Sequence, residues 1–267
     1  MSFYLDRPLN FAHRGASHEA PANTLAAFLL AVDLGADGIE LDVHLSKDGH
    51  VVVIHDFDVS ATTDGQGLVS DKTLAELKEL DAGSWSDPVF AGQRIPTLQE
   101  VIDAVGQRLL LNIELKVRGW SDGGLAAKVV QIVKESGLVD RVILSSFNPL
   151  AVWRAKRRNP QIATGLLYAE DMPLFLRRAW SRWLLRPTAL HPHCVMVNSH
   201  YVWWANRQSY RVTVWTVDDP GDMRRLMRQG VDIIITNRPD LLREVVQAGQ
   251  PAAGQSKQRL PALRSSE

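Results

Sequence analysis

The sequence has a single cysteine, no net charge and no long apolar run, and each of these absences excludes a class of protein. Cys194 has no partner for an intramolecular disulfide, which is typical of proteins from a reducing compartment. The 30 Lys and Arg residues balance 30 Asp and Glu residues, so no overall positive field would hold nucleic acid. Every apolar run is far shorter than the roughly 20 residues of a membrane-spanning helix. We therefore expect a globular protein without a nucleic-acid partner.

The two ends of the chain carry little structural signal. Residues 1–10 have neither the basic nor the apolar segment of a secretory signal peptide, so we expect a cytoplasmic protein. Residues 250–267 contain no aromatic or β-branched side chain. Such a segment buries too little apolar surface to offset the entropy lost on ordering. We predict one domain over residues 1–248 and a disordered tail over 249–267, and no pattern indicates an oligomeric state.

Short β-branched runs alternate with amphipathic segments along the 267-residue chain, of which 45% is apolar. Strands that alternate with helices in this way predict βα units around a parallel sheet. The nine predicted strands are Leu9–Ala12, Gly38–Val43, Val51–His55, Leu109–Leu115, Val142–Ser146, Ile162–Leu167, Cys194–Asn198, Val212–Thr216 and Asp232–Thr236.

Capping residues mark several helix starts between these strands. Asn23 is predicted to cap the first helix, and Thr97 with Glu100 forms a capping box. Asn148 followed by Pro149 supplies a cap and a proline at the first helical position.

Nine strands are one more than a (β/α)8 barrel needs, and the segment 45–50 accounts for the extra one. It is too short for a parallel crossover, and Lys47-Asp48-Gly49 favours a turn. We predict that Val51–His55 folds back beside Gly38–Val43. The fold class is then a (β/α)8 TIM barrel of about 250 residues, with a hairpin and an insertion over about 57–95 in its second βα unit. A doubly wound open sheet is the alternative.

Polar side chains interrupt the predicted strands with a period of two. Glu40 and Asp42 share one face of their strand, and Glu114 and Lys116 share one face of another. Catalytic groups of (β/α)8 barrels lie at the carboxyl ends of the strands, so we expect these residues at the barrel mouth. Three further polar residues follow the first strand and the hairpin: His13, Arg14 and His55.

The charges of this set predict a cation and an anion. Burying Glu40, Asp42 and Glu114 together without a cation would cost on the order of several kcal/mol each. Oxygen ligands alone favour a hard ion, Mg²⁺ or Ca²⁺. Arg14 and Lys116 then require an anion, and a phosphate beside the metal satisfies both. The two histidines of the same edge would supply a general acid and a general base.

Eight short motifs occur in an order that resembles a known family. They are His13-Arg14-Gly15, Pro21-Ala22-Asn23-Thr24, Glu40-Leu41-Asp42-Val43, Lys47-Asp48-Gly49, His55-Asp56, Ile95-Pro96-Thr97-Leu98, Glu114-Leu115-Lys116 and Val214-Trp215-Thr216. Together they resemble the glycerophosphodiester phosphodiesterases of the bacterial cytosolic type, over roughly residues 9–245. The resemblance implies a (β/α)8 barrel with an insertion after the second strand's hairpin.

The resemblance also implies residue roles. It assigns metal binding to Glu40, Asp42 and Glu114, acid–base catalysis to His13 and His55, phosphate binding to Arg14 and Lys116, and an apolar wall near the substrate to Trp215. Two positions depart from the family, which usually has glutamate at Ala22 and often aspartate at Asn237. These departures concern contacts around the metal triad and the fit of the substrate.

The implied reaction is hydrolysis of glycerophosphodiesters such as glycerophosphocholine to glycerol 3-phosphate and an alcohol. The glycerol 2-hydroxyl attacks phosphorus with one histidine as base, the other histidine protonates the leaving alcohol, and water opens the cyclic phosphate. Two alternatives remain: a lysophospholipase D-type activity on lysolipids, and a barrel that binds phosphodiesters without turnover.

The segment 174–186 is rich in tryptophan and arginine. Trp180, Trp183 and Leu184 share one face of the helix predicted there, and arginines recur on the other face. The preferred interpretation is a barrel helix whose apolar face packs on the sheet. A helix at a membrane surface is the alternative, so contact with a membrane is possible but not favoured.

Minor predictions concern the remaining histidines and the cysteine. His44, in the hairpin, is expected to face solvent. His191 and His193 are placed in the loop before the strand at 194–198, where Cys194 would be an inert buried side chain.

Overall fold

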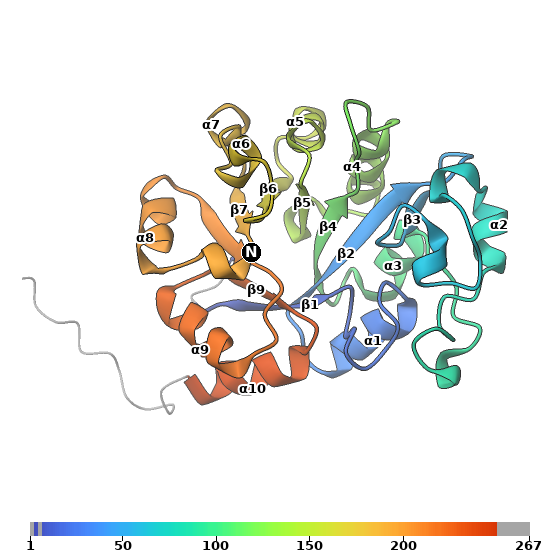
Figure 1. Cartoon of the computed structure of the whole chain (residues 1–267), viewed down its shortest axis with the longest axis horizontal. Helices are drawn as coiled ribbons and strands as arrows, with labels where there is room; N and C mark the ends of the chain where they lie inside the picture. Colours follow the sequence, from blue (N-terminus) through green and yellow to red (C-terminus); the bar gives the residue numbers. More distant parts are fainter. Residues whose placement is uncertain (1–2, 5–6, 250–267) are drawn as a thin grey trace, which may run out of the picture.

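The computed structural model describes residues 3–4 and 7–249, so the predicted tail beyond residue 249 lies outside the described residues. The strands are β1 (Leu9–His13), β2 (Gly38–Leu45), β3 (Val51–Val53), β4 (Leu110–Leu115), β5 (Val142–Ser146), β6 (Ala163–Tyr168), β7 (Ala189–Pro192), β8 (Arg211–Val214) and β9 (Ile233–Thr236). Eight of these are parallel and run in the order β1-β9-β8-β7-β6-β5-β4-β2, and pairing of β1 with β2 closes the ring (Figure 1). The predicted TIM barrel is confirmed, and the open sheet is excluded.

Helices cover the outside of the ring. They are α1 (Leu25–Asp33), α2 (Leu74–Glu79), α3 (Leu98–Val105), α4 (Leu125–Glu135), α5 (Pro149–Arg158), α6 (Leu174–Arg177), α7 (Arg182–Leu185), α8 (Ser199–Arg207), α9 (Pro220–Gln229) and α10 (Pro239–Gly249). Short 3-10 helices lie at Val59–Ala61, Val69–Asp71, Pro88–Phe90, Val139–Arg141 and Cys194–Met196. Within residues 3–4 and 7–249, no helix is both long enough and apolar enough to cross a bilayer.

The helix starts agree with the predicted caps at two of three places. Thr97 and Glu100 form a capping box at α3, and the Asn148 side chain caps α5, whose first residue is proline. The prediction for α1 was wrong, because Thr24 is its N-cap. Asn23 lies in the left-handed region at φ 59°, and its side chain turns away from the helix to Asp42.

The predicted hairpin is confirmed. β3 pairs antiparallel with β2, with Val53 opposite Val43 and Val51 opposite Leu45, and it lies outside the ring. The insertion that follows contains α2, and its Leu77 packs in a small apolar cluster that also includes Val52 of β3. This insertion extends the chain between β3 and α3 without interrupting the barrel.

Successive side chains along each strand point alternately outward to the helices and inward to the barrel interior. One parity packs under the helices, as Leu41 and Ile113 do. The other parity points into the barrel, where Phe11, Ile143 and Ile233 fill the end at which the strands begin. The polar residues of β2 and β4 also point into the barrel, but they lie at the end where the strands finish. The barrel interior is therefore apolar where the strands begin and polar at its mouth.

The seventh strand lies earlier than predicted. β7 is Ala189–Pro192 and pairs with β6, whereas Cys194–Met196 is a 3-10 helix in which Val195 is exposed. His191 is therefore a buried strand residue and not part of a loop. The strand is hard to read in the sequence because it is only four residues long and ends in a proline, which is depleted in strands.

The predicted helix over 174–186 is broken into α6 and α7. Ala179 and Arg186 have left-handed backbones, at φ 47° and 43°, and a right-handed helix cannot continue through such residues. The apolar face does not pack on the sheet, because Trp183 and Leu184 remain exposed while Ala179 and Leu185 are buried. The preferred interpretation of this segment was wrong.

Candidate functional site

The three predicted carboxylates meet at the carboxyl ends of two neighbouring strands. β2 and β4 pair in parallel with Asp42 opposite Glu114 and Glu40 opposite Asn112. One oxygen from each of Glu40, Asp42 and Glu114 lies within 4.8 Å of the others, and all three residues are buried. The period-two spacing in the sequence therefore becomes one compact cluster of oxygen atoms.

The cluster holds more negative charge than the nearby cations neutralise. Lys116 Nζ lies 2.9 Å from Glu114 Oε1 and 3.2 Å from Asp42 Oδ1. Arg14 Nε lies 3.3 Å from Asp42 Oδ2, close enough for an ion pair but not aligned as a hydrogen bond. Three carboxylates against two cations leave one negative charge, which a divalent ion would turn into one positive charge. A phosphodiester, with one negative charge, would then balance the site.

The pKa values of the carboxyl groups reflect this imbalance. Burial and repulsion by the other two carboxylates raise the pKa of Glu40 well above its usual value. Burial raises the pKa of Glu114 to about 7, although Lys116 opposes the shift. Burial alone would raise the pKa of Asp42, but Lys116 and Arg14 hold it below its usual range. Without a cation the cluster therefore favours protonation of Glu40 and Glu114, and a bound cation would favour the ionised form of all three carboxylates.

His13 ends β1 beside the carboxylate cluster. Its Nε2 lies 3.9 Å from Glu40 Oε2, and its Nδ1 lies 2.7 Å from Asn237 Oδ1. Because Asn237 Nδ2 donates to Asp218, the amide oxygen faces the histidine and accepts a hydrogen bond from the Nδ1–H group. Burial and the charge of Arg14 lower the pKa of His13 to about 4.

His55 follows β3 and reaches the same pocket. Its Nδ1 lies 2.9 Å from Asp56 Oδ1, so a carboxylate holds this ring where an amide holds His13. Burial lowers the pKa of His55, while Asp42 opposes the shift and Asp56 does so more weakly. Its main-chain oxygen lies 3.1 Å from His44 Nε2.

The turn after β1 depends on Gly15. Arg14 and Gly15 both have positive φ, at 56° and 86°, and the Arg14 N–H donates to Glu40 Oε2 at 3.2 Å. A Cβ atom on Gly15 would lie 2.6 Å from the main chain of Ala27 in α1. The His-Arg-Gly order therefore bends the chain sharply enough to direct both His13 and Arg14 to the carboxylates.

A pocket of about 170 Å³ opens above the carboxylates. One side of the pocket is lined by charged and titratable residues: His13, His55, Arg14, Glu40 and Glu114. Phe147, Leu167 and Trp215 line the other side, and the rings of Phe147 and Trp215 meet edge to face at 5.4 Å. The pocket therefore combines a charged wall with an apolar wall.

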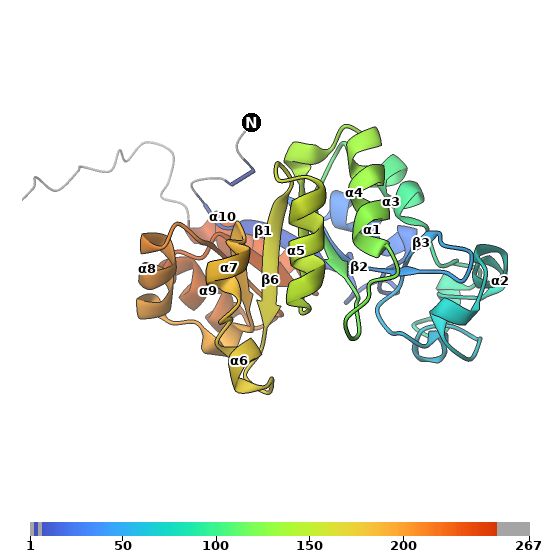
Figure 2. The ribbon, with the colours of Figure 1, turned by 90° about the horizontal axis from the view of Figure 1, so that it is seen from above.

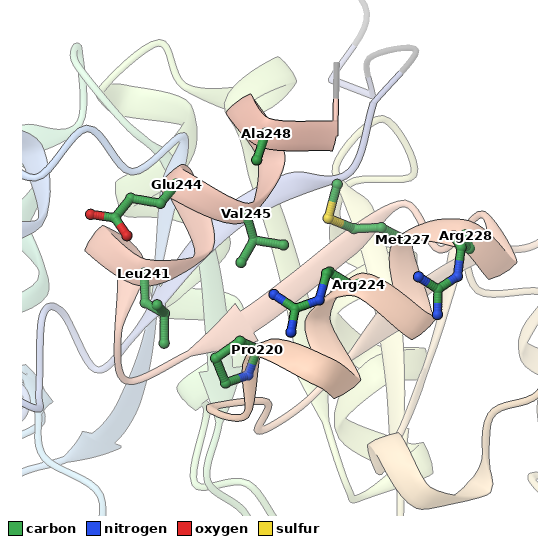
Figure 3. A pocket seen from close by; sticks show the side chains of 8 residues that line it. All are labelled: Pro220, Arg224, Met227, Arg228, Leu241, Glu244, Val245 and Ala248. Carbon is green, nitrogen blue, oxygen red and sulfur yellow. The ribbon is translucent and has the colours of Figure 1, made fainter. Parts of the chain in front are cut away.

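A larger hollow of about 920 Å³ lies elsewhere, on the outer side of the barrel between α9 and α10 (Figure 3). Arg224 and Arg228 flank it on α9, and Leu241 and Val245 line it on α10. Its lining contains no histidine and a single carboxylate, so its size does not make it the centre of the chemistry.

A family model described as the glycerophosphoryl diester phosphodiesterase family matches residues 13–241. The chain belongs to this family. It is accordingly a phosphoric diester hydrolase.

Relatives of the glycerophosphodiester phosphodiesterase family match nearly the whole chain. A glycerophosphodiester phosphodiesterase from Caldanaerobacter subterraneus subsp. tengcongensis is 43% identical over 91% of this chain and 99% of its own length. A phosphodiesterase from Oleispira antarctica, solved in complex with the product sn-glycerol-3-phosphate, is 35% identical with a TM-score of 0.83, covering 92% of this chain and 100% of that one. A glycerophosphodiester phosphodiesterase structure from Agrobacterium tumefaciens is 30% identical with a TM-score of 0.77, covering 88% and 98%.

Three residues at this candidate site were not assigned to it from the sequence. Asn23 Nδ2 donates to Asp42 Oδ2 at 2.9 Å and so orients that carboxylate. Asn237 and Asp56 hold the Nδ1 atoms of the two histidines. Only Asp56 has a local signal, its position next to His55, because Asn23 and Asn237 meet their partners through the closed barrel.

The prediction for His44 was wrong. It is buried, and its ring meets the edge of Phe57 at 4.6 Å, so it does not face solvent. Its parity on β2 is that of Glu40 and Asp42, which the period-two rule could have used.

Proposed function

We propose that the chain hydrolyses water-soluble glycerophosphodiesters to glycerol 3-phosphate and an alcohol, with one bound Mg²⁺ or Ca²⁺ and with His13 and His55 as the acid–base pair. The observation that carries the proposal is the pocket itself, in which both histidines lie beside the carboxylate cluster and its two cations. The product-bound Oleispira antarctica relative supports glycerol 3-phosphate as a product.

Glu40, Asp42 and Glu114 fit a divalent cation. Their oxygens converge within 4.8 Å, they are all hard ligands, and their charge exceeds that of the two neighbouring cations by one. When bound, the ion would stabilise charge on the phosphoryl oxygens. Arg14 and Lys116 would bind the same oxygens from the protein side.

The hydrogen bonds of the two histidines favour different roles. Each ring has its Nδ1 held, which leaves Nε2 to exchange a proton with the substrate. The neutral amide of Asn237 stabilises an imidazolium less than a carboxylate would, and burial lowers the pKa of His13 to about 4, so His13 suits the base that takes the proton of the glycerol 2-hydroxyl. The Asp56 carboxylate does stabilise an imidazolium, so His55 suits the acid that protonates the leaving alcohol. A cyclic phosphate then forms, and water opens it.

Substrate size follows from the pocket. A volume of about 170 Å³ suits a glycerophosphoryl unit, and any longer group must extend through the mouth. Trp215 and Phe147 would contact the carbon skeleton of the glycerol. The single free Cys194 is consistent with action in the cytoplasm.

The deciding experiment measures glycerol 3-phosphate released from glycerophosphocholine by the full-length chain, with Mg²⁺ or Ca²⁺ and then with EDTA. We expect release that EDTA abolishes and either ion restores. Release of choline from lysophosphatidylcholine, with no glycerol 3-phosphate released from glycerophosphocholine, would instead support the lysolipid activity. Tight binding of glycerophosphocholine without any release would show a barrel that only binds.

A further inference from the structure

One stretch of the chain is basic although the whole chain is neutral. Between Met172 and Val217 there is no aspartate or glutamate, whereas arginine occurs six times. The exposed part of this stretch that includes α6 and α7 is here named the Trp/Arg surface. It is defined by Phe175, Arg177, Arg178, Trp180, Trp183 and Leu184.

Large apolar side chains are concentrated on the Trp/Arg surface. Among the described residues, 13 large apolar side chains are exposed, and five of these belong to the short segment 174–184. Trp180 is 50% exposed and Trp183 is 71% exposed. Exposed apolar side chains on a monomeric protein are normally scattered singly, so this cluster indicates a surface that is covered in use.

The composition of the cluster identifies what covers it. Tryptophan is the residue that lies at the boundary between lipid headgroups and acyl chains, and arginine is attracted to anionic headgroups. A protein partner of opposite character would need both acidic and apolar groups, whereas an anionic bilayer offers negative charge directly above an apolar layer. The chain itself supplies no acidic residue within the surface to compete for the arginines.

The Trp/Arg surface begins at the barrel mouth. It starts after β6, whose Leu167 lines the pocket. Glu170 pairs with His193 at 3.1 Å, and the His193 ring lies 5.1 Å from the Trp215 ring in the pocket wall. In Figure 2, α6 lies beyond the arrowhead of β6, on the side to which the strands of the barrel lead.

We propose that the Trp/Arg surface docks the chain on an anionic phospholipid bilayer, with Trp180, Trp183 and their apolar neighbours at the headgroup boundary and the arginines on the headgroups. The contact is peripheral and places the barrel mouth near the membrane. Docking does not depend on the proposed catalysis, since none of these side chains contacts the pocket.

The test measures co-flotation of the full-length chain with large vesicles of phosphatidylcholine that contain about 30% phosphatidylglycerol. Vesicles of phosphatidylcholine alone are the comparison. We expect binding to the anionic vesicles at about 0.05 M NaCl and roughly tenfold weaker binding at about 0.5 M NaCl, because salt screens the arginines. Equal binding to both vesicles, or to neither, would overturn the proposal.

Two double variants locate the contact. Trp183→Ser with Leu184→Ser, and Arg177→Gln with Arg178→Gln, should each weaken binding roughly tenfold or more while the thermal unfolding midpoint stays within a few degrees. The control for the arginine variant is Arg224→Gln with Arg228→Gln on α9, which removes the same charge. The control for the apolar variant is Leu29→Ser on α1, which lies across the ring from β6. An equal loss in the controls would contradict the proposed location. The native chain could instead form a dimer that the double variant Trp183→Ser with Leu184→Ser abolishes. That result would show that a second copy of the chain covers the surface, and it would overturn the proposal.

Discussion

The carboxylate cluster and the Trp/Arg surface depart from ordinary burial in opposite directions. Glu40 and Asp42 are charged side chains that the barrel buries, whereas Trp180 and Trp183 are apolar side chains that it leaves exposed. Each departure costs free energy in the isolated chain. The comparison indicates that both regions need something outside the chain, which we propose to be a cation with a phosphate in one case and a lipid surface in the other.

The largest effect should come from removing a histidine. His13→Ala or His55→Ala should lower turnover of glycerophosphocholine by about 10³-fold, because a positioned acid or base is lost. His50→Ala, on the exposed turn of the hairpin, is the matched control and should keep normal turnover. Near-normal turnover in both pocket variants would remove the histidines from the reaction.

The second-largest effect should come from Glu40→Gln, which should stabilise the chain and inactivate it. The raised pKa of Glu40 means that its ionised form opposes folding above the unfolded-state pKa of about 4.3, and that this cost disappears as the pH falls below that value. In the metal-free chain at neutral pH, Glu40→Gln should therefore raise the free energy of unfolding by about 1 kcal/mol or more, while turnover is lost.

Urea unfolding with and without Mg²⁺ measures both consequences of this change. Mg²⁺ should stabilise the native chain but not Glu40→Gln. The control is Glu19→Gln, at an exposed glutamate, for which neither measurement should move. A less stable Glu40→Gln chain would contradict the account of excess charge in the cluster.

A smaller effect should separate the two histidines. Asp56→Asn removes a carboxylate that favours protonated His55, so the pKa of His55 should fall further below its usual value. Because an acid works only while protonated, the alkaline limb of the kcat/KM profile should move to lower pH by a similar amount. The exposed Asp71→Asn should leave both limbs in place. Movement of the acidic limb instead would exchange the roles of His13 and His55.

The smallest effect should be seen at the Trp/Arg surface. Trp183→Ser with Leu184→Ser should change turnover of water-soluble glycerophosphocholine by less than about twofold, because exposed side chains outside the pocket contribute little to folding or catalysis. Steady-state kinetics without vesicles checks this. A large loss of turnover would show that the Trp/Arg surface supports the structure of the pocket. The two regions could then not be treated as independent of each other.

Several elements were readable from the sequence because their signals are local. The hairpin could be predicted because its connecting segment is too short for a parallel crossover. The caps of α3 and α5 could be predicted because the residues that form each cap lie three or fewer positions apart. The seventh strand was misplaced, because its inward residue is His191 and a more β-like run follows it. The helix over 174–186 was misread since the left-handed turn at Ala179 has no sequence signal: alanine is a strong helix former.

The sequence by itself determined the barrel and the shared face of Glu40 and Asp42, because the period of a strand is a property of its own backbone. Only the tertiary structure decided that Asn237 holds His13 across 224 residues of chain, and that Asn23 orients Asp42. It alone decided that Trp183 faces solvent, because exposure depends on the path of the chain around the closed ring. Local backbone geometry can be read along the chain, whereas a contact between distant segments exists only once the barrel has closed.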